Sequence, residues 1–127
     1  MDCTEHLRFQ IPMADGMIAA INEFRRQHGV GVVEHWDMQQ AEFCKEHCIA
    51  MARCGELYHA ESFYLRDWKE AVAMHSWMDQ WSIVQDRLIF DVLGSSEPHR
   101  RILLESNCMA YAVWTGNWQV YLTIRAK

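Results

Sequence analysis

The chain has 127 residues, half of them hydrophobic, and its six Trp, five Phe and four Tyr exclude a disordered protein. That length suits one domain with one core, and a formal charge of -5 without a basic run disfavours a nucleic-acid partner. No apolar run approaches the roughly 18–20 residues that cross a bilayer, so we expect no transmembrane segment.

The start of the chain is weakly patterned, and we expect an N-terminal arm at residues 1–14 before a single domain at residues 15–127. The first residues lack the apolar core of a signal peptide, so we expect either an intracellular protein or a chain that begins after a removed leader. Five cysteines are an odd number, and Cys44 and Cys48 are spaced too closely on one helix for a disulfide. We interpret the cysteines mainly as small apolar core residues.

The first predicted helix begins at Asp15, an N-cap residue, and runs to about His28, with Gly29 ending it. Its inner stripe consists of Ile18, Ile21 and Phe24 or Arg25. A β-prone run of valines follows at residues 30–33 and ends near Trp36.

The second predicted helix begins at Asp37, whose spacing to Gln40 is that of a capping box, and it ends at Gly55. Its apolar stripe is Ala41, Cys44, Cys48 and Met51. Cys44, His47 and Cys48 are candidate metal ligands, but cysteines at this spacing favour the core interpretation.

A connecting stretch at residues 56–69 contains Leu57-Tyr58-His59, and Glu70 then opens a short apolar run that ends at Met74. We predict a longer helical region after this run, because apolar residues recur at spacings of three or four and indicate a buried face. These residues are Trp77, Trp81, Val84, Leu88 and Val92.

Residues 94–105 have the pattern of a further helix. Ser95 or Ser96 can cap it, and the acid and proline that follow suit its first turn. His99 lies near its positive end, where the helix dipole favours a neutral ring that can bind a metal or a proton.

A β-hairpin is predicted at the end of the chain, with strands at residues 109–114 and 118–124. The turn is Thr115-Gly116-Asn117, in which Gly-Asn supplies the positive φ that a tight turn needs. The small side chains of Ala110 and Ala112 indicate that one face of the hairpin lies close under a helix.

Five segments occur in a specific order: an Asn-to-Gly-Val helix at 21–30, Glu-His-Trp-Asp at 34–37, a helix at 41–52, Leu-Tyr-His at 57–59 and Ser-Glu-Pro-His-Arg-Arg-Ile-Leu at 96–103. In this order they resemble the CAP superfamily (cysteine-rich secretory proteins, antigen 5 and pathogenesis-related 1 proteins), in particular its short bacterial members with an SCP-like domain. The resemblance implies an α+β fold, a three-layer α/β/α sandwich with a small, mostly antiparallel sheet between helices.

The resemblance also implies a central cleft with two histidines and one or two acids. His59 and His99 fall on the two histidine motifs, and Glu70 falls on the Glu of a Gly-Glu-Asn motif, with Lys69 and Ala71 replacing its Gly and Asn. Asp79 matches the family's second acid only loosely, and we do not assign it.

The chemistry of this cleft is that of a metal or ligand site. Two neutral imidazoles can hold Zn²⁺ or another divalent cation, so His59 and His99 are candidate metal ligands. Glu70 can orient a ligand, accept a hydrogen bond or act as a base. The alternative is that both histidines are ordinary polar groups lining a groove. The remaining histidines have no such context and are treated as ordinary: His6, His28, His35 and His75.

We interpret the protein as a non-enzymatic cleft-binding protein for a small ligand or peptide, and the resemblance implies an extracellular or cell-surface location. One alternative is a peptidase-like hydrolase that uses a metal-bound water, or Ser95 or Ser96 with His99, although no nucleophile elbow or His-Glu-x-x-His motif is present. A second is a surface recognition scaffold with a vestigial cleft. The sequence indicates no oligomeric state.

Overall fold

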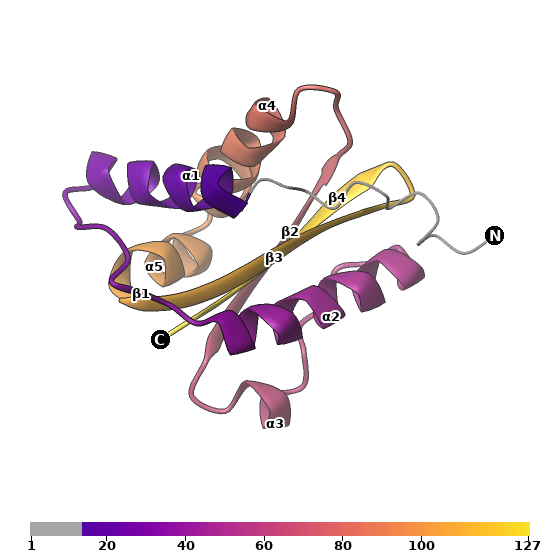
Figure 1. Ribbon diagram of the computed structural model, residues 1–127, viewed down its shortest axis with the longest axis horizontal. Helices are drawn as coiled ribbons and strands as arrows, with labels where there is room; N and C mark the ends of the chain where they lie inside the picture. The colour runs from indigo at the N-terminus through magenta and orange to yellow at the C-terminus, as the bar shows by residue number, and fades with distance from the viewer. Residues whose placement is uncertain (1–13) are drawn as a thin grey trace.

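The computed structural model describes residues 14–127, and nearly all of the predicted arm lies outside them. Figure 1 shows a sheet between two layers of helices. The elements in chain order are α1 (Ala14–Gln27), β1 (His35–Trp36), α2 (Met38–Cys54), α3 (Ser62–Leu65), β2 (Lys69–Ser76), α4 (Trp81–Asp86), the π-helix η2 (Arg87–Leu93), α5 (Glu97–Glu105), β3 (Cys108–Gly116) and β4 (Gln119–Ala126).

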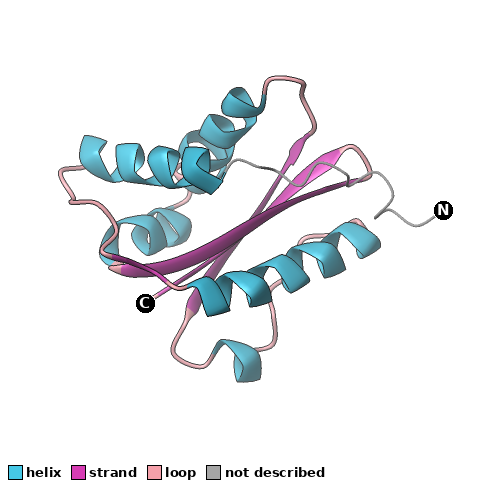
Figure 2. Cartoon of the chain, viewed as in Figure 1, coloured by secondary structure: helices cyan, strands magenta, loops and turns pink. Residues whose placement is uncertain are grey.

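The four strands lie in the order β1-β3-β4-β2, with β1 parallel to β3 and the other two pairs antiparallel. Figures 1 and 2 show α1, α4 and α5 on one face of the sheet and α2 and α3 on the other. The predicted α+β sandwich with a terminal hairpin is therefore confirmed. No helix in residues 14–127 has the length and apolar character needed to span a membrane.

Each face of the sheet has its own core. The larger core joins the sheet to α1, α4, η2 and α5, and includes Ile21, Leu88 and Leu103. The smaller core lies under α2, where Cys48 Sγ approaches the carbonyl oxygen of Ala112 to 3.3 Å. This short distance confirms the prediction that the small residues of the hairpin lie close under a helix.

Helix α1 already includes Ala14, so Asp15 lies inside the helix rather than at its N-cap. Gly29 ends the helix as expected, with a φ of +74° that few other residues adopt without strain. The valine run was predicted to be a strand, but only His35–Trp36 pairs with the sheet. The prediction was wrong because the Val33 N–H donates to the Asn22 side chain, which ties the run to α1 instead.

The caps of α2 follow the sequence signals closely. Asp37 Oδ1 accepts from the Gln40 N–H at 2.9 Å, and Gly55, with a φ of +71°, donates its N–H to Met51 O. The capping box is only half formed, because the Gln40 side chain accepts from Arg125 and the Asp37 N–H donates to the carbonyl oxygen of Met109.

The long helical region predicted from Trp77 is shorter in the structure. Strand β2 runs to Ser76, Trp77 donates its N–H to the carbonyl oxygen of Trp118, and α4 begins only at Trp81. The helix then widens into η2, which Gly94 closes by donating its N–H to Ile89 O. The stripe is nevertheless buried at its centre, as predicted for Trp81, Val84 and Leu88.

Two predictions were wrong in detail: the serine cap of α5 and the position of the hairpin turn. Ser96 occupies the N-cap position of α5 without a side-chain capping bond, and Ser95 Oγ donates to the carbonyl oxygen of Val92. In the hairpin Gly116 pairs with Gln119, so the turn residues are Asn117 and Trp118, with φ of +55° and +62°. The register moved the turn by one residue, because it is set by pairing along the whole of β3 and β4.

Gly94 provides a test of how tightly η2 meets α1. A Cβ at this position would lie 2.7 Å from the Phe90 carbonyl oxygen and 2.7 Å from Phe24 Cε2. We expect Gly94→Ala to destabilise the protein by about 1–3 kcal/mol, because a backbone oxygen cannot move aside cheaply. The control is Gly31→Ala, where a Cβ meets nothing within 4 Å. Urea denaturation of both variants measures the difference, and equal midpoints would contradict the expectation.

Candidate functional site

The candidate site is built around the carboxylate of Glu70, whose side chain is only 1% exposed. Glu70 lies on β2 and shares a strand face with Val72, which packs under α2. Its Oε1 accepts from the Ala60 N–H at 2.9 Å and lies 3.1 Å from His59 Nδ1. Its Oε2 accepts from Arg125 Nε at 3.2 Å. These contacts supply the partners that a buried carboxylate requires.

Arg125 is the counter-charge that sequence reasoning missed. It lies directly opposite Glu70 in the antiparallel pair of β2 and β4, and its side chain is 4% exposed. Its Nη1 also donates to Gln40 Oε1 at 3.2 Å, which links the pair to the first turn of α2. The register of the sheet brings Glu70 and Arg125 together, so no local motif could have indicated the pair.

His59 lies in the loop after α2, with a side chain that is 56% exposed. Because a carboxylate can only accept, His59 Nδ1 donates its proton to Glu70. In the neutral form of the ring this bond leaves Nε2 as the acceptor nitrogen, and it also fixes the orientation of the ring. The structure therefore brings together two of the three predicted site residues.

His99 approaches from the other helical layer, in the first turn of α5, which packs against the edge strand β2. Burial and, secondarily, an electrostatic contribution from His59 lower the pKa of His99. The sequence predicted a neutral ring here from the helix dipole, whereas burial is the main cause. Within residues 14–127, buried Nδ1 of His99 has no hydrogen-bond partner. An orphaned buried nitrogen is unusual and calls for an explanation.

A groove of about 560 Å³ opens between α2 and the segment that contains α3, and its lining includes Arg125 but neither His59 nor His99. His47 lines it, and its Nε2 donates to the carbonyl oxygen of Tyr58 at 2.6 Å while lying 3.9 Å from Glu70 Oε1. The apolar part of the lining includes Phe43, Leu65 and Trp68. Ala60, the residue after His59, also lines the groove, so the groove adjoins the histidine site.

Two of the three cysteines of α2, Cys44 and Cys48, belong to the core, as the sequence predicted, whereas Cys54 is exposed. Cys44 and Cys48 are fully buried, and burial raises the pKa of each thiol to about 12. We therefore expect iodoacetamide at neutral pH to leave both unmodified in the folded protein while it modifies the exposed Cys54. Mass spectrometry of tryptic peptides measures this, with urea-unfolded protein as the control. Modification of Cys44 or Cys48 as fast as Cys54 would show that α2 opens readily.

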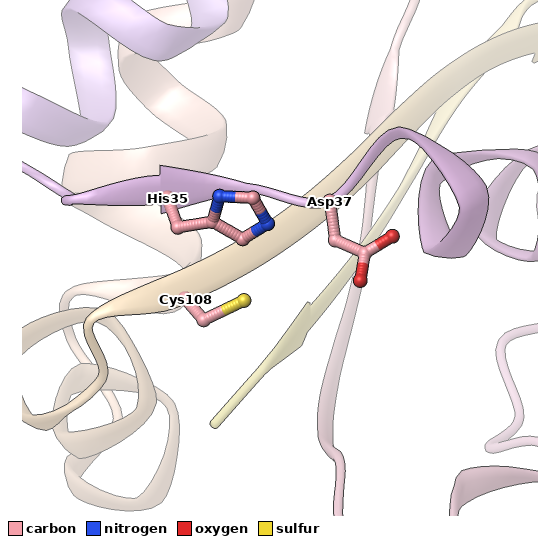
Figure 3. Close-up of side chains that lie close together, drawn as sticks. All are labelled: His35, Asp37 and Cys108. Atoms are coloured by element: carbon pink, nitrogen blue, oxygen red, sulfur yellow. The ribbon is translucent and has the colours of Figure 1, made fainter.

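A compact set of three metal-ligating side chains lies elsewhere. Among residues 14–127, the His, Cys, Asp and Glu side chains whose ligand atoms all lie within 4.8 Å of one another form one group, His35, Asp37 and Cys108 (Figure 3). At the predicted cleft site, the Glu70 carboxylate is turned inward to Arg125 and Ala60. Sequence reasoning had treated His35 as ordinary.

No protein-family model and no curated protein sequence matches the chain. Solved structures do share its architecture. An outer surface protein from Borrelia burgdorferi is 13% identical, with a TM-score of 0.65 over 92% of this chain and 96% of that protein. NaASP2, solved with Zn²⁺, is 10% identical, with a TM-score of 0.64 over 88% and 77%. The Ancylostoma-secreted protein Ac-ASP-7 is 8% identical, with a TM-score of 0.63 over 91% and 68%. The fold is CAP-like. At these identities the likeness concerns the fold alone.

Proposed function

We propose that the protein is a CAP/SCP-like cleft-binding protein in which His59 and His99 hold a divalent cation such as Zn²⁺. The observation that carries this proposal is the orphaned, buried Nδ1 of His99. A bound ion is one of the few things that accounts for a polar group left without a protein partner.

The protonation state of His99 and the hydrogen bond of His59 suit metal binding. The lowered pKa of His99 keeps its ring neutral at neutral pH, and a neutral imidazole is the form that binds a metal. Glu70 holds His59 by Nδ1 and so leaves Nε2 of His59 available, which is the carboxylate–histidine–metal arrangement of many zinc sites. In this proposal Glu70 is a positioning residue that does not touch the ligand.

Two histidine ligands leave coordination positions open for water or for an atom of a bound molecule. The adjoining groove supplies apolar surface from Phe43, Leu65 and Trp68 beside the charged Arg66 and Asp67. This mixture suits a small amphipathic molecule or a peptide. The Zn²⁺ in the structure of NaASP2 supports the choice of probe. The names of Ac-ASP-7 and of the Borrelia outer surface protein support an extracellular or cell-surface location.

The hydrolase alternative receives less support from the site. Ser95 Oγ donates to the carbonyl oxygen of Val92 at 3.2 Å, so it is occupied within its own turn rather than by His99. Activation of a serine requires a base within hydrogen-bond reach of its hydroxyl. We therefore propose binding rather than catalysis as the role of the cleft.

The test is isothermal titration calorimetry with Zn²⁺. We expect His99→Ala to bind one Zn²⁺ fewer per chain than the wild type, because one of only two imidazole ligands is lost. The lost site should also remove its share of thermal stabilisation, which reaches about 2.7 kcal/mol at a free Zn²⁺ concentration of 100 times Kd.

The matched control for this titration is His75→Ala. His75 lies on the same strand as Glu70 but near its other end, and its Nδ1 donates to the carbonyl oxygen of Ser76. This variant should bind Zn²⁺ like the wild type. An unchanged stoichiometry and affinity in both His59→Ala and His99→Ala would refute the proposed cleft site and would favour the vestigial-cleft scaffold.

A further inference from the structure

Three side chains of different ligand chemistry converge where α2 begins, away from the proposed cleft site. His35 and Cys108 are directly paired in the parallel register of β1 and β3. Asp37 follows His35 by two residues, a spacing that returns a side chain to the same side of an extended chain. Figure 3 shows the imidazole, the carboxylate and the thiol on one side of the strand pair, and all their ligand atoms lie within 4.8 Å of one another.

Most polar atoms of this set have no hydrogen-bond partner in the described protein. Asp37 Oδ1 caps α2 by accepting from the Gln40 N–H, which leaves Oδ2 with no partner among residues 14–127. In the same part of the chain neither the His35 ring nor the Cys108 thiol has a hydrogen-bond partner. Three side chains that can each ligate a metal therefore face a common point. The capping of α2 accounts for only one of their ligand atoms, Asp37 Oδ1.

The backbone that carries the three residues is held by main-chain hydrogen bonds. The His35 N–H donates to Asn107 O at 3.1 Å, and the Asp37 N–H donates to Met109 O at 2.8 Å. On the other side of β3, Cys108 and Lys127 exchange two bonds at 3.0 and 2.9 Å. The Cα positions are thus fixed before any ion arrives, which is what a preorganised site requires.

We propose that His35, Asp37 and Cys108 form a second Zn²⁺ site, with water in the fourth coordination position. Imidazole nitrogen, carboxylate oxygen and thiolate sulfur are the three ligand types that zinc uses, and three protein ligands with one open position is a known zinc arrangement. Ligand atoms of a tetrahedral zinc ion are about 3.3–3.8 Å apart, given Zn–ligand distances of about 2.0–2.3 Å. The side chains must therefore draw together by about 1 Å, and the exposed ring of His35 is free to turn.

The ion would also strengthen the weakest pairing in the sheet. Strand β1 has two residues, and the parallel register joins it to β3 only at His35 and Trp36. A metal that bridges His35 and Asp37 to Cys108 would add a direct link across this pair. This proposal does not rest on the function proposed for the cleft.

The test uses Co²⁺ in place of Zn²⁺, because a cobalt–thiolate bond produces a charge-transfer band in the near ultraviolet that imidazole and carboxylate ligands do not. We expect the band in the wild type and its loss in Cys108→Ser. The matched control is Cys54→Ser, which removes an exposed cysteine on α2 and should keep the band. His99→Ala should also keep it, which separates this site from the proposed cleft site.

A second variant guards against the chance that Cys108→Ser disturbs β3. His35 is exposed, so His35→Ala should fold normally, and we expect it to weaken Co²⁺ binding by at least about tenfold. Absence of the band in the wild type, its survival in Cys108→Ser, or wild-type Co²⁺ affinity in His35→Ala would each overturn the proposal.

Discussion

Replacing Glu70 with Ala is expected to destabilise the protein by about 3–5 kcal/mol, the range for breaking one partner out of a buried ion pair. Arg125 would keep its charge at a position that is 4% exposed, and within residues 14–127 only the Gln40 side chain would remain as its hydrogen-bond acceptor. The Ala60 N–H would lose its acceptor as well. Urea denaturation followed by circular dichroism measures the free energy of unfolding.

The double variant makes this expectation specific to the charge pair. If an unpaired charge causes the loss, Glu70→Ala combined with Arg125→Ala should destabilise by clearly less than the sum of the single changes, because neither charge is then left alone. Additive effects would instead show that each side chain contributes through packing. The His59 ring offers a second readout, since loss of its bond to Glu70 should alter its imidazole NMR signals.

The sequence predicted helix ends correctly where the end is determined by residues within one turn of it. Asp37 and Gly55 bound α2 in the structure, because a capping oxygen and a left-handed residue act within one turn of their own chain. Gly29 succeeded for the same reason. The prediction that Ser95 or Ser96 caps α5 was wrong. A serine at this position does not have to turn its hydroxyl toward the helix, and Ser95 instead donates to the carbonyl oxygen of Val92.

Features that depend on strand register could not be predicted from the sequence. The hairpin turn lies at Asn117 and Trp118 because Gly116 is paired with Gln119, and no turn propensity favours Trp at a positive φ. Arg125 lies opposite Glu70 for the same reason, and Cys108 lies opposite His35. Each of these pairs joins residues distant in sequence, and neither partner carries a local signal of the other.

The candidate cleft could be predicted in part, less well than the helix ends and better than the pairs set by strand register. His59 and His99 are ordinary residues when each is taken alone, and only their place in an ordered set of family-like motifs singled them out. The hydrogen bond from His59 to Glu70 follows from the loop after α2 folding back onto β2, which the sequence did not specify. The orphaned nitrogen of His99 is a property of packing around α5. The family resemblance therefore identified His59 and His99 as candidates, whereas the hydrogen bond of His59 and the unpartnered nitrogen of His99 are seen only in the structure.

Arg25 is the second residue for which a large effect is expected, and its burial was left open by the sequence, where Phe24 and Arg25 competed for the inner stripe of α1. Both are buried, and Arg25 is only 1% exposed. Its Nε donates to Gly31 O at 2.6 Å, and its Nη1 donates to Leu103 O at 2.8 Å and to Ser106 O at 2.7 Å. The guanidinium thus joins α1 to the loop that follows it and to the last turn of α5, where backbone carbonyls otherwise lack intrahelical donors.

Replacing Arg25 with Met keeps the apolar stem but should destabilise the protein by about 3–5 kcal/mol, since hydrogen bonds from a charged group contribute about 1.5–3 kcal/mol each and part of this is offset by relief from burying the charge. Arg26→Met is the matched control, because Arg26 is exposed and, among the described residues, pairs only with Glu23 on the same helix. Thermal denaturation should separate the two variants clearly. Hydrogen exchange should also quicken in Glu97–Glu105 of Arg25→Met, because that helix loses its tie to α1. Exchange that quickened only in α1 would mean that the arginine stabilises its own helix and that α5 is held by its apolar contacts through Leu103.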